Sequence, residues 1–106
     1  MSLLLLCLVT VGYVCCMPYV SDVTSVVISP YRWDAYTAFI HAAYNYGFRP
    51  VAPVSAEASN YNYVLGRFDN YDLTFDVYNG YKFQRCQVQV TWLEDEPMKF
   101  DDIRCW

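Results

Sequence analysis

Cysteine and histidine are the residues of this sequence whose chemistry is easiest to assess. Of the 5 cysteines, Cys7, Cys15 and Cys16 lie in an apolar N-terminal stretch, which leaves Cys86 and Cys105 in the rest of the chain. In an oxidising compartment these two predict one disulfide, which closes a loop of about twenty residues. Two thiols and a lone histidine cannot supply the four ligands of a structural zinc site. We therefore expect no metal and no cofactor.

The sequence holds no recognisable catalytic centre. The single histidine, His41, falls within a predicted amphipathic helix, and no nucleophile motif surrounds it. The alternation around Cys86 places this thiol in the interior of a strand. There it is better interpreted as half of a disulfide than as a catalytic nucleophile. The carboxylates of the segment 94–102 lack the alternating oxygen ligands and central glycine of a calcium loop. The chain is therefore not expected to be an enzyme.

A leucine-rich stretch without charged side chains opens the chain over residues 1–16. Its apolar core is too short to span a bilayer and is typical of a secretory signal peptide. Cleavage after Cys16 and cleavage after Gly12 both satisfy the small-residue rule. We expect a signal peptide over 1–16 and a single secreted, extracellular domain over 17–106. No membrane association is expected after signal removal.

Charge excludes one large class of partners. All 7 basic and all 11 acidic residues follow residue 16, and the net charge is −4. Nucleic-acid binding requires a basic patch, so no nucleic acid is expected as a partner. At 56% hydrophobic and 17% charged residues, the chain is too apolar to be disordered. About ninety residues form one small core, which a disulfide would help to stabilise.

One helix precedes a series of strands in the predicted order of elements. The run Val26–Ile28 is typical of a short strand or an extended arm. Ser29 and Pro30 form a helix start, because serine caps free amide groups and proline suits the first helical position. Apolar residues at spacings of three and four then predict an amphipathic helix over Tyr31–Tyr46, and Gly47 ends it.

Beyond Pro53 the hydrophobic period changes to two. The strands that this alternation predicts are 61–65, 71–77, 86–92 and a last one that ends at Cys105. Asn79-Gly80 predicts a type I′ hairpin turn. The result is an α+β fold, in which one N-terminal amphipathic helix packs on a four- to five-stranded antiparallel sheet. The aromatic residues expected in the core are Trp33, Phe39, Phe75 and Phe100.

This arrangement resembles the secreted cystatins over about residues 31–105. Tyr44-Asn45 is similar to the end of the cystatin helix, and 70–77 is similar to the family's Asn-Tyr-x-φ-x-φ-x-Val strand, where φ is apolar. The segment from Cys86 to Cys105 is similar to the final disulfide hairpin. The resemblance implies a cystatin-like fold and inhibition of papain-like cysteine proteases. Cystatins inhibit with a wedge made of an N-terminal glycine segment and two hairpin loops.

Both loops depart from the cystatin pattern. The first loop falls at Val64–Phe68, and it has neither the glutamine nor the closing glycine of Gln-x-Val-x-Gly. The second loop holds Trp92 and Pro97 in the reverse order of the family's Pro-Trp pair. Close backbone approach requires small residues, so we expect weak inhibition of papain-like proteases or none.

Two functions remain open for a protein partner. The first is a divergent inhibitor or binder of papain-like cysteine proteases that acts through the hairpin-loop edge. The alternative is a non-inhibitory extracellular binding or structural module on the same fold. The resemblance places the arm Met17–Asp22 and both loops at one edge. The candidate contact residues there are Arg67, Phe68, Asp69, Trp92, Leu93 and Glu94.

Aromatic residues leave two further readings open. Trp92 is either the anchor of the loop edge or an inward-facing residue that continues the face of Cys86, Val88 and Val90. The chain also has 11 tyrosines. Tyrosines that the core does not accommodate would suit contact with protein or carbohydrate, because the ring is large and its tip is polar.

Overall fold

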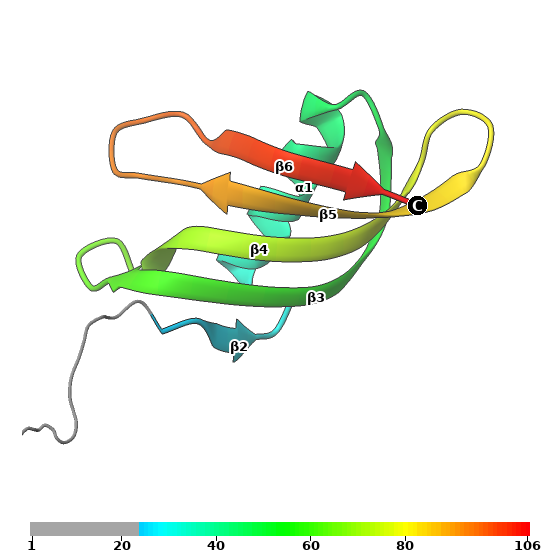
Figure 1. Cartoon of the computed structure of the whole chain (residues 1–106). Helices are drawn as coiled ribbons and strands as arrows, with labels where there is room; N and C mark the ends of the chain where they lie inside the picture. The colour runs from blue at the N-terminus through cyan, green and yellow to red at the C-terminus, as the bar shows by residue number, and fades with distance from the viewer. Residues whose placement is uncertain (1–23) are drawn as a thin grey trace, which may run out of the picture.

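The computed structural model of the chain describes residues 24–106 (Figure 1). The expected signal peptide, its cleavage site and the arm Met17–Asp22 lie outside these residues. Among the helices of the described residues, none has the length and apolar character needed to cross a membrane.

One helix lies against one face of a five-stranded antiparallel sheet (Figure 1). The strands lie side by side in chain order: β2 (Val26–Ile28), β3 (Arg49–Asn62), β4 (Arg67–Tyr78), β5 (Phe83–Thr91) and β6 (Lys99–Cys105). Helix α1 (Trp33–Asn45) connects β2 to β3. The expected α+β class is confirmed. The helix follows β2, so it is not the first element of the described chain.

Helix α1 begins two residues later than the sequence predicts. The Ser29 hydroxyl accepts the Tyr31 N–H at 3.1 Å, and the Ser29 carbonyl accepts the Arg32 N–H at 3.0 Å. Ser29 therefore closes a separate turn ahead of the helix. The predicted end is confirmed, because Gly47 has a φ of 78° and the Phe48 N–H returns to the Ala43 carbonyl at 2.9 Å.

The first long strand was predicted to begin beyond Pro53, and this is wrong. Strand β3 starts at Arg49 and contains both Pro50 and Pro53. Its pairing with β4 is irregular directly after each proline. Proline has no N–H to donate to a ladder, and a bulge is a position where a sheet tolerates it. The same strand ends at Asn62, so the predicted strand 61–65 is mostly a turn.

The hairpin between β4 and β5 also differs from its prediction. Tyr78 pairs with Phe83, which leaves a loop of the four residues 79–82. Within this loop Gly80 has a φ of 100°, whereas Asn79 does not have the positive φ that a type I′ turn requires. The Asn79 side-chain oxygen instead accepts the N–H groups of Tyr81 and Lys82, at 2.9 and 3.1 Å. Asparagine favours this side-chain turn over the tighter backbone turn.

The core lies between α1 and the inner face of the sheet. The helix contributes four alanines, which allow it to approach the sheet closely, and Phe39. The sheet contributes alternate residues of β4 and β5, namely Tyr71, Leu73, Phe75, Val77, Cys86, Val88 and Val90. Phe39 and Phe75 are buried as predicted, and Phe100 packs partly buried against them. Trp33 was expected in the core, but it is 55% exposed at the start of the helix.

Cys86 and Cys105 form the disulfide that the sequence predicts, between directly paired residues of β5 and β6. Replacing both by alanine is expected to lower the free energy of unfolding by about 3 kcal/mol, because the unfolded chain regains the freedom of the closed loop. Chemical denaturation of the wild type and the double variant measures this difference. Mass spectrometry of the non-reduced wild type provides the control, and two free thiols there would contradict the pairing.

Candidate functional site

Two hairpin loops lie at the same end of the sheet (Figure 1). The first, residues 63–66, joins β3 to β4, and the second, residues 92–98, joins β5 to β6. The second loop is connected to the start of β4, close to the first loop, because the Trp92 N–H donates to the Asp69 carbonyl at 2.7 Å. We call this end of the molecule the loop edge.

The tip of the first loop presents two large side chains. Tyr63 is 89% exposed and Val64 is 86% exposed. Asn62 fixes the backbone below them, because its side-chain oxygen accepts the N–H groups of Val64 and Leu65 at 3.0 and 3.1 Å. Gly66 completes the turn with a φ of 71°, and its N–H donates to the Asn62 carbonyl at 2.8 Å. The tip is thus held in a defined shape by backbone and Asn62 hydrogen bonds, and the Tyr63 ring packs on the ring of Tyr61 at a centroid distance of 4.8 Å.

Arg67 and Phe68 were expected in the first loop, but both belong to β4. Arg67 is 6% exposed, and its guanidinium carbon lies 3.9 Å from the centre of the Trp92 ring. The same guanidinium donates to the carbonyls of Phe68 and Trp92. Arg67 therefore links the start of β4, directly after the first loop, to Trp92 in the second loop. Its stacking against the indole adds a cation–π contact to these hydrogen bonds.

Trp92 lies between the two positions that the sequence left open, the core and the surface of the loop edge. It directly follows β5, is half-buried and packs against the core cluster. The edge of the exposed Trp33 ring approaches it at a centroid distance of 6.2 Å. Beyond Trp92, Leu93 is 37% exposed and Glu94 is exposed. Among the candidate residues, Leu93 and Glu94 are thus directly accessible, Trp92 partly so, and Arg67 hardly at all.

A buried carboxylate lies beneath the first loop, and sequence reasoning missed it. The Asp34 side chain is fully buried in the first turn of α1. It accepts hydrogen bonds from Arg32 Nε at 2.7 Å, from the Ala35 N–H at 3.0 Å and from the Tyr71 hydroxyl at 2.7 Å. Three donors satisfy a charge that would otherwise be very unfavourable in the core. Burial, followed by the hydrogen bond to Asp34, raises the pKa of Tyr71.

The Asp34 network continues into the first loop. Arg32 Nη2 donates to the Gly66 carbonyl at 3.0 Å, and the Phe68 N–H donates to the Tyr71 hydroxyl at 3.1 Å. The Arg32 guanidinium also lies over the Phe68 ring, 5.3 Å from its centre. The hydrogen bond to Asp34 raises the pKa of Arg32, so this cation stays charged. The start of the helix and the base of the loop are therefore held together by a paired, hydrogen-bonded network.

The chemistry of the loop edge comes from its aromatic side chains and not from a cluster of metal-ligating residues. Within residues 24–106, no three residues of the His, Cys, Asp and Glu types gather as a metal site would require. His41 is exposed on α1. In the part of the chain that the structure describes, Asp69 Oδ1 is buried without a hydrogen-bond partner. Rigid, exposed Tyr and Trp side chains are typical of protein contact surfaces.

No family model, curated protein or solved structure matches the chain.

Proposed function

We propose that this protein is a secreted cystatin-like binder of papain-like cysteine proteases, which inserts its loop edge into the partner's cleft. The observation that carries the proposal is the pair of exposed side chains, Tyr63 and Val64, on a fixed loop that leads into Arg67, which stacks on Trp92. The order of elements, with one helix between a short first strand and four long strands, supports the resemblance to cystatins.

Rigidity favours this mode of binding. Asn62 and the Arg32–Gly66 hydrogen bond fix the first loop before any partner arrives. A preorganised loop loses little conformational entropy on binding. Tyr63 then acts as the anchor, because large aromatic side chains in central positions contribute most of the binding energy in protein interfaces.

Charge at the second loop should favour some protease partners over others. Glu94, Asp95 and Glu96 are exposed there, and Lys99 pairs with one of them, Glu96, at 3.7 Å. The loop therefore carries excess negative charge. A protease with basic residues at the rim of its cleft would be favoured, and association should slow as salt is added.

The experiment is a titration of papain and a cathepsin with the purified protein, read as residual activity and as binding. We expect binding with weak inhibition, with an inhibition constant no lower than about micromolar. The reason is that Tyr63 and Val64 place bulk at the loop tip, which limits how closely the loop can approach the catalytic residues of the protease. Tyr63→Ala should raise the dissociation constant at least about tenfold, which is the effect expected from the loss of one anchor side chain. Tyr63 is preferred to Trp92 as the site of the change, because Trp92 also packs against the core.

Tyr81→Ala is the matched control. Tyr81 is 93% exposed in the hairpin between β4 and β5, at the other end of the sheet. Its loss should leave protease binding unchanged. Equal effects of Tyr63→Ala and Tyr81→Ala would contradict binding through the loop edge.

A non-inhibitory binding module is the second candidate, and Arg67 favours it. Its neighbour Phe68 stands where the family's inhibitory loop closes with a glycine, and Arg67 itself is engaged by the Phe68 and Trp92 carbonyls and by the Trp92 ring. In that case the same titration yields no inhibition and no binding with either protease, while the fold remains intact.

A further inference from the structure

The face of the sheet that points away from α1 ends in three aromatic side chains, far from the loop edge. Tyr78 and Phe83 pair across β4 and β5, and their ring centres lie 5.1 Å apart. Trp106 follows β6, and its backbone exchanges two hydrogen bonds with Arg85, at 2.9 and 3.1 Å. Cys86 faces the core, so its neighbour Arg85 and the paired Trp106 face outward. We call Tyr78, Phe83 and Trp106 the aromatic platform.

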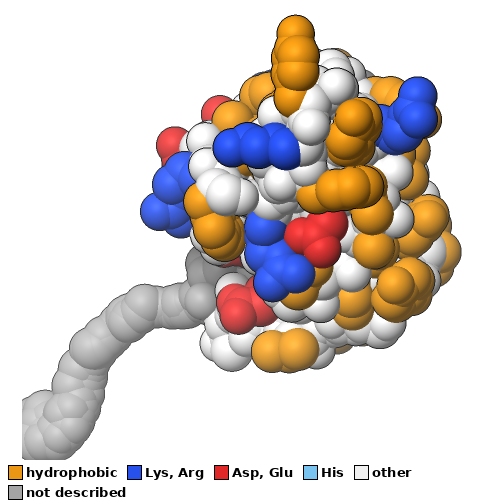
Figure 2. Space-filling view, turned by 90° about the vertical axis from the view of Figure 1, so that its right-hand side faces the viewer, with side chains coloured by type: hydrophobic (Ala, Val, Ile, Leu, Met, Phe, Trp, Pro, Cys, Tyr) orange, Lys and Arg blue, Asp and Glu red, His pale blue; other side chains and the backbone are white. Residues whose placement is uncertain are grey.

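The platform is open to solvent. Phe83 is 69% exposed and Trp106 is 64% exposed. Figure 2 looks onto this end of the molecule, where hydrophobic side chains stand among basic and acidic ones. Leaving two such rings in water is unfavourable unless a partner covers them, so an exposed aromatic group of this kind indicates a contact site.

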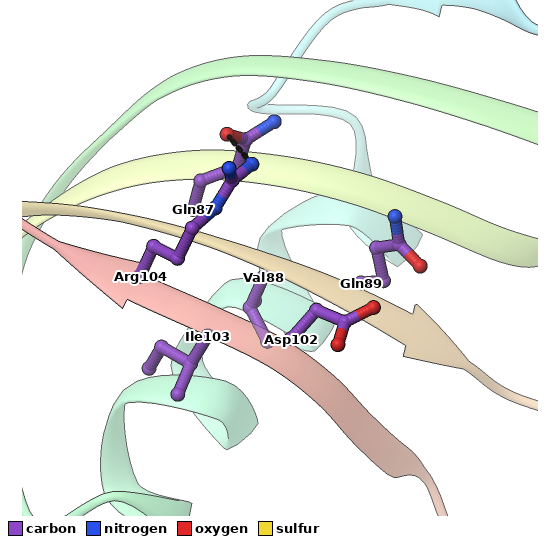
Figure 3. A pocket seen from close by; sticks show the side chains of 6 residues that line it. All are labelled: Gln87, Val88, Gln89, Asp102, Ile103 and Arg104. Atoms are coloured by element: carbon purple, nitrogen blue, oxygen red, sulfur yellow. Dashed lines mark hydrogen bonds between the residues drawn. The ribbon is translucent and has the colours of Figure 1, made fainter.

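A hollow of about 420 Å³ lies beside the platform, between β5 and β6. It forms where the two strands lose regular pairing, between Gln87 and Gln89. On the opposite strand Asp102 has a φ of 56°, which is rare for a residue with a side chain. Such bulges redirect side chains and are enriched next to binding sites. The hollow is lined by Gln87, Val88, Gln89, Asp102, Ile103 and Arg104 (Figure 3).

Polar side chains between the hollow and the platform are held in place by one another. Arg104 Nη2 donates to Gln87 Oε1 at 3.0 Å (Figure 3), and Gln87 Nε2 donates to Asp72 Oδ1 at 3.0 Å. Arg85 donates to both carboxylate oxygens of Asp76, at 2.8 and 3.2 Å. This row of amide, guanidinium and carboxylate groups crosses β4, β5 and β6. It offers donors and acceptors at fixed positions, and the cation of Arg85 is already neutralised.

We propose that the platform and the adjoining hollow form a binding site for a neutral oligosaccharide. A pyranose ring has an apolar C–H face, which packs on an aromatic ring, and hydroxyls that both donate and accept hydrogen bonds. Trp106 and Phe83 supply the rings, and Gln87, Arg104 and Asp102 supply partners of both kinds. The hollow falls within the usual size range of small-ligand sites.

Charge selects neutral sugars over acidic ones. Around the hollow, the carboxylates of Asp72 and Asp102 outnumber the guanidinium of Arg104, and the whole chain carries a net charge of −4. A sulfated or carboxylated glycan would meet repulsion from these carboxylates at the hollow. The site shares no residue with the proposed protease contact: the platform lies at the opposite end of the sheet, and the hollow lies midway along β5 and β6.

Titration of the purified protein with cellohexaose, laminarihexaose and mannohexaose, followed by NMR, tests the proposal. We expect at least one of them to bind with a roughly millimolar dissociation constant. The indole of Trp106 and the side-chain amide of Gln87 should shift together. Trp106→Ala and Gln87→Ala should each weaken this binding at least about tenfold, and a heparin hexasaccharide should produce no shifts at these groups.

Tyr63→Ala, at the loop edge, is the matched control and should leave sugar binding unchanged, while thermal melts verify that each variant is folded. Several results would overturn the proposal. They are the absence of shifts with all three neutral sugars, tighter binding of the heparin fragment, or binding that neither platform variant weakens. A dimer seen by sedimentation that Trp106→Ala abolishes would assign the platform to a second copy of the chain instead.

Discussion

Asp34→Ala is expected to lower the free energy of unfolding by about 3–5 kcal/mol, since removing one partner of a buried charge pair has an effect of this size. The carboxylate is fully buried and accepts three hydrogen bonds. Its loss leaves the Tyr71 hydroxyl and the Ala35 N–H without their partner. Arg32 is one-third exposed and can still reach water, so the lower end of the range is expected. Urea denaturation of both proteins measures the difference.

Asp34→Asn and Tyr71→Phe separate the charge from the hydrogen bonds. The amide keeps an acceptor for Arg32 and Ala35, so its effect should be smaller than that of alanine. Tyr71→Phe removes the hydroxyl that bridges Asp34 and the Phe68 N–H, and should lower the free energy of unfolding by about 1–3 kcal/mol. In the double variant the effects of Asp34→Ala and Tyr71→Phe should not add, because the residues share one network. Simple additivity would show that the two residues act independently.

The Asp34 network supports both the stability of the fold and the loop for which we propose partner binding. Arg32 connects Asp34 to the Gly66 carbonyl, directly below the exposed tip of the first loop. A binding loop with exposed side chains needs support from elsewhere, since its own tip makes few contacts. The network supplies that support from the start of the helix. Loosening it should therefore lower stability and weaken the partner binding that we propose for Tyr63.

The parts of the fold that follow a regular period could be predicted from sequence. Strands β4 and β5 alternate cleanly, so Phe75, Cys86 and Val88 were assigned to the core, and all three are buried. The helix followed from its spacing of apolar residues, and the disulfide followed from counting cysteines. The sequence predicts a start for β3 that is too late, because proline is rare within paired strands and normally lies before or after them. The bulges that accommodate Pro50 and Pro53 leave no period to recognise.

The site was harder to predict, since it depends on contacts between distant segments. Asp34 falls between the apolar positions of the helix, a pattern typical of a solvent-facing residue, and its partner Tyr71 lies 37 residues away. Arg67 was placed at a loop tip, but Trp92 and two carbonyls draw it below the surface. A local signal for the actual tip was present: two large residues, Tyr63 and Val64, lie just ahead of Gly66. Sequence alone did not distinguish that turn from a continuing strand.

Phe39→Ala is expected to lower the free energy of unfolding by about 3–5 kcal/mol, because the ring fills the space between helix and sheet. Phe39 is 1% exposed, and its ring centre lies 5.2 Å from that of Phe75 and 5.5 Å from that of Tyr36. The other buried positions on α1 that face the sheet, apart from Asp34, are alanines. These alanines are too small to fill the cavity, so relaxation should recover little of the loss.

Tyr44→Ala on the same helix is the matched control for Phe39→Ala. Tyr44 is 64% exposed, and its replacement removes an aromatic ring from the helix surface without opening a cavity in the core. The change should alter the free energy of unfolding by no more than about 0.5 kcal/mol, as is usual for surface positions. Denaturant unfolding of the two variants side by side compares the two faces of α1. Similar losses for both would mean that Phe39 does not anchor the helix to the sheet, and the packing described here would have to be revised.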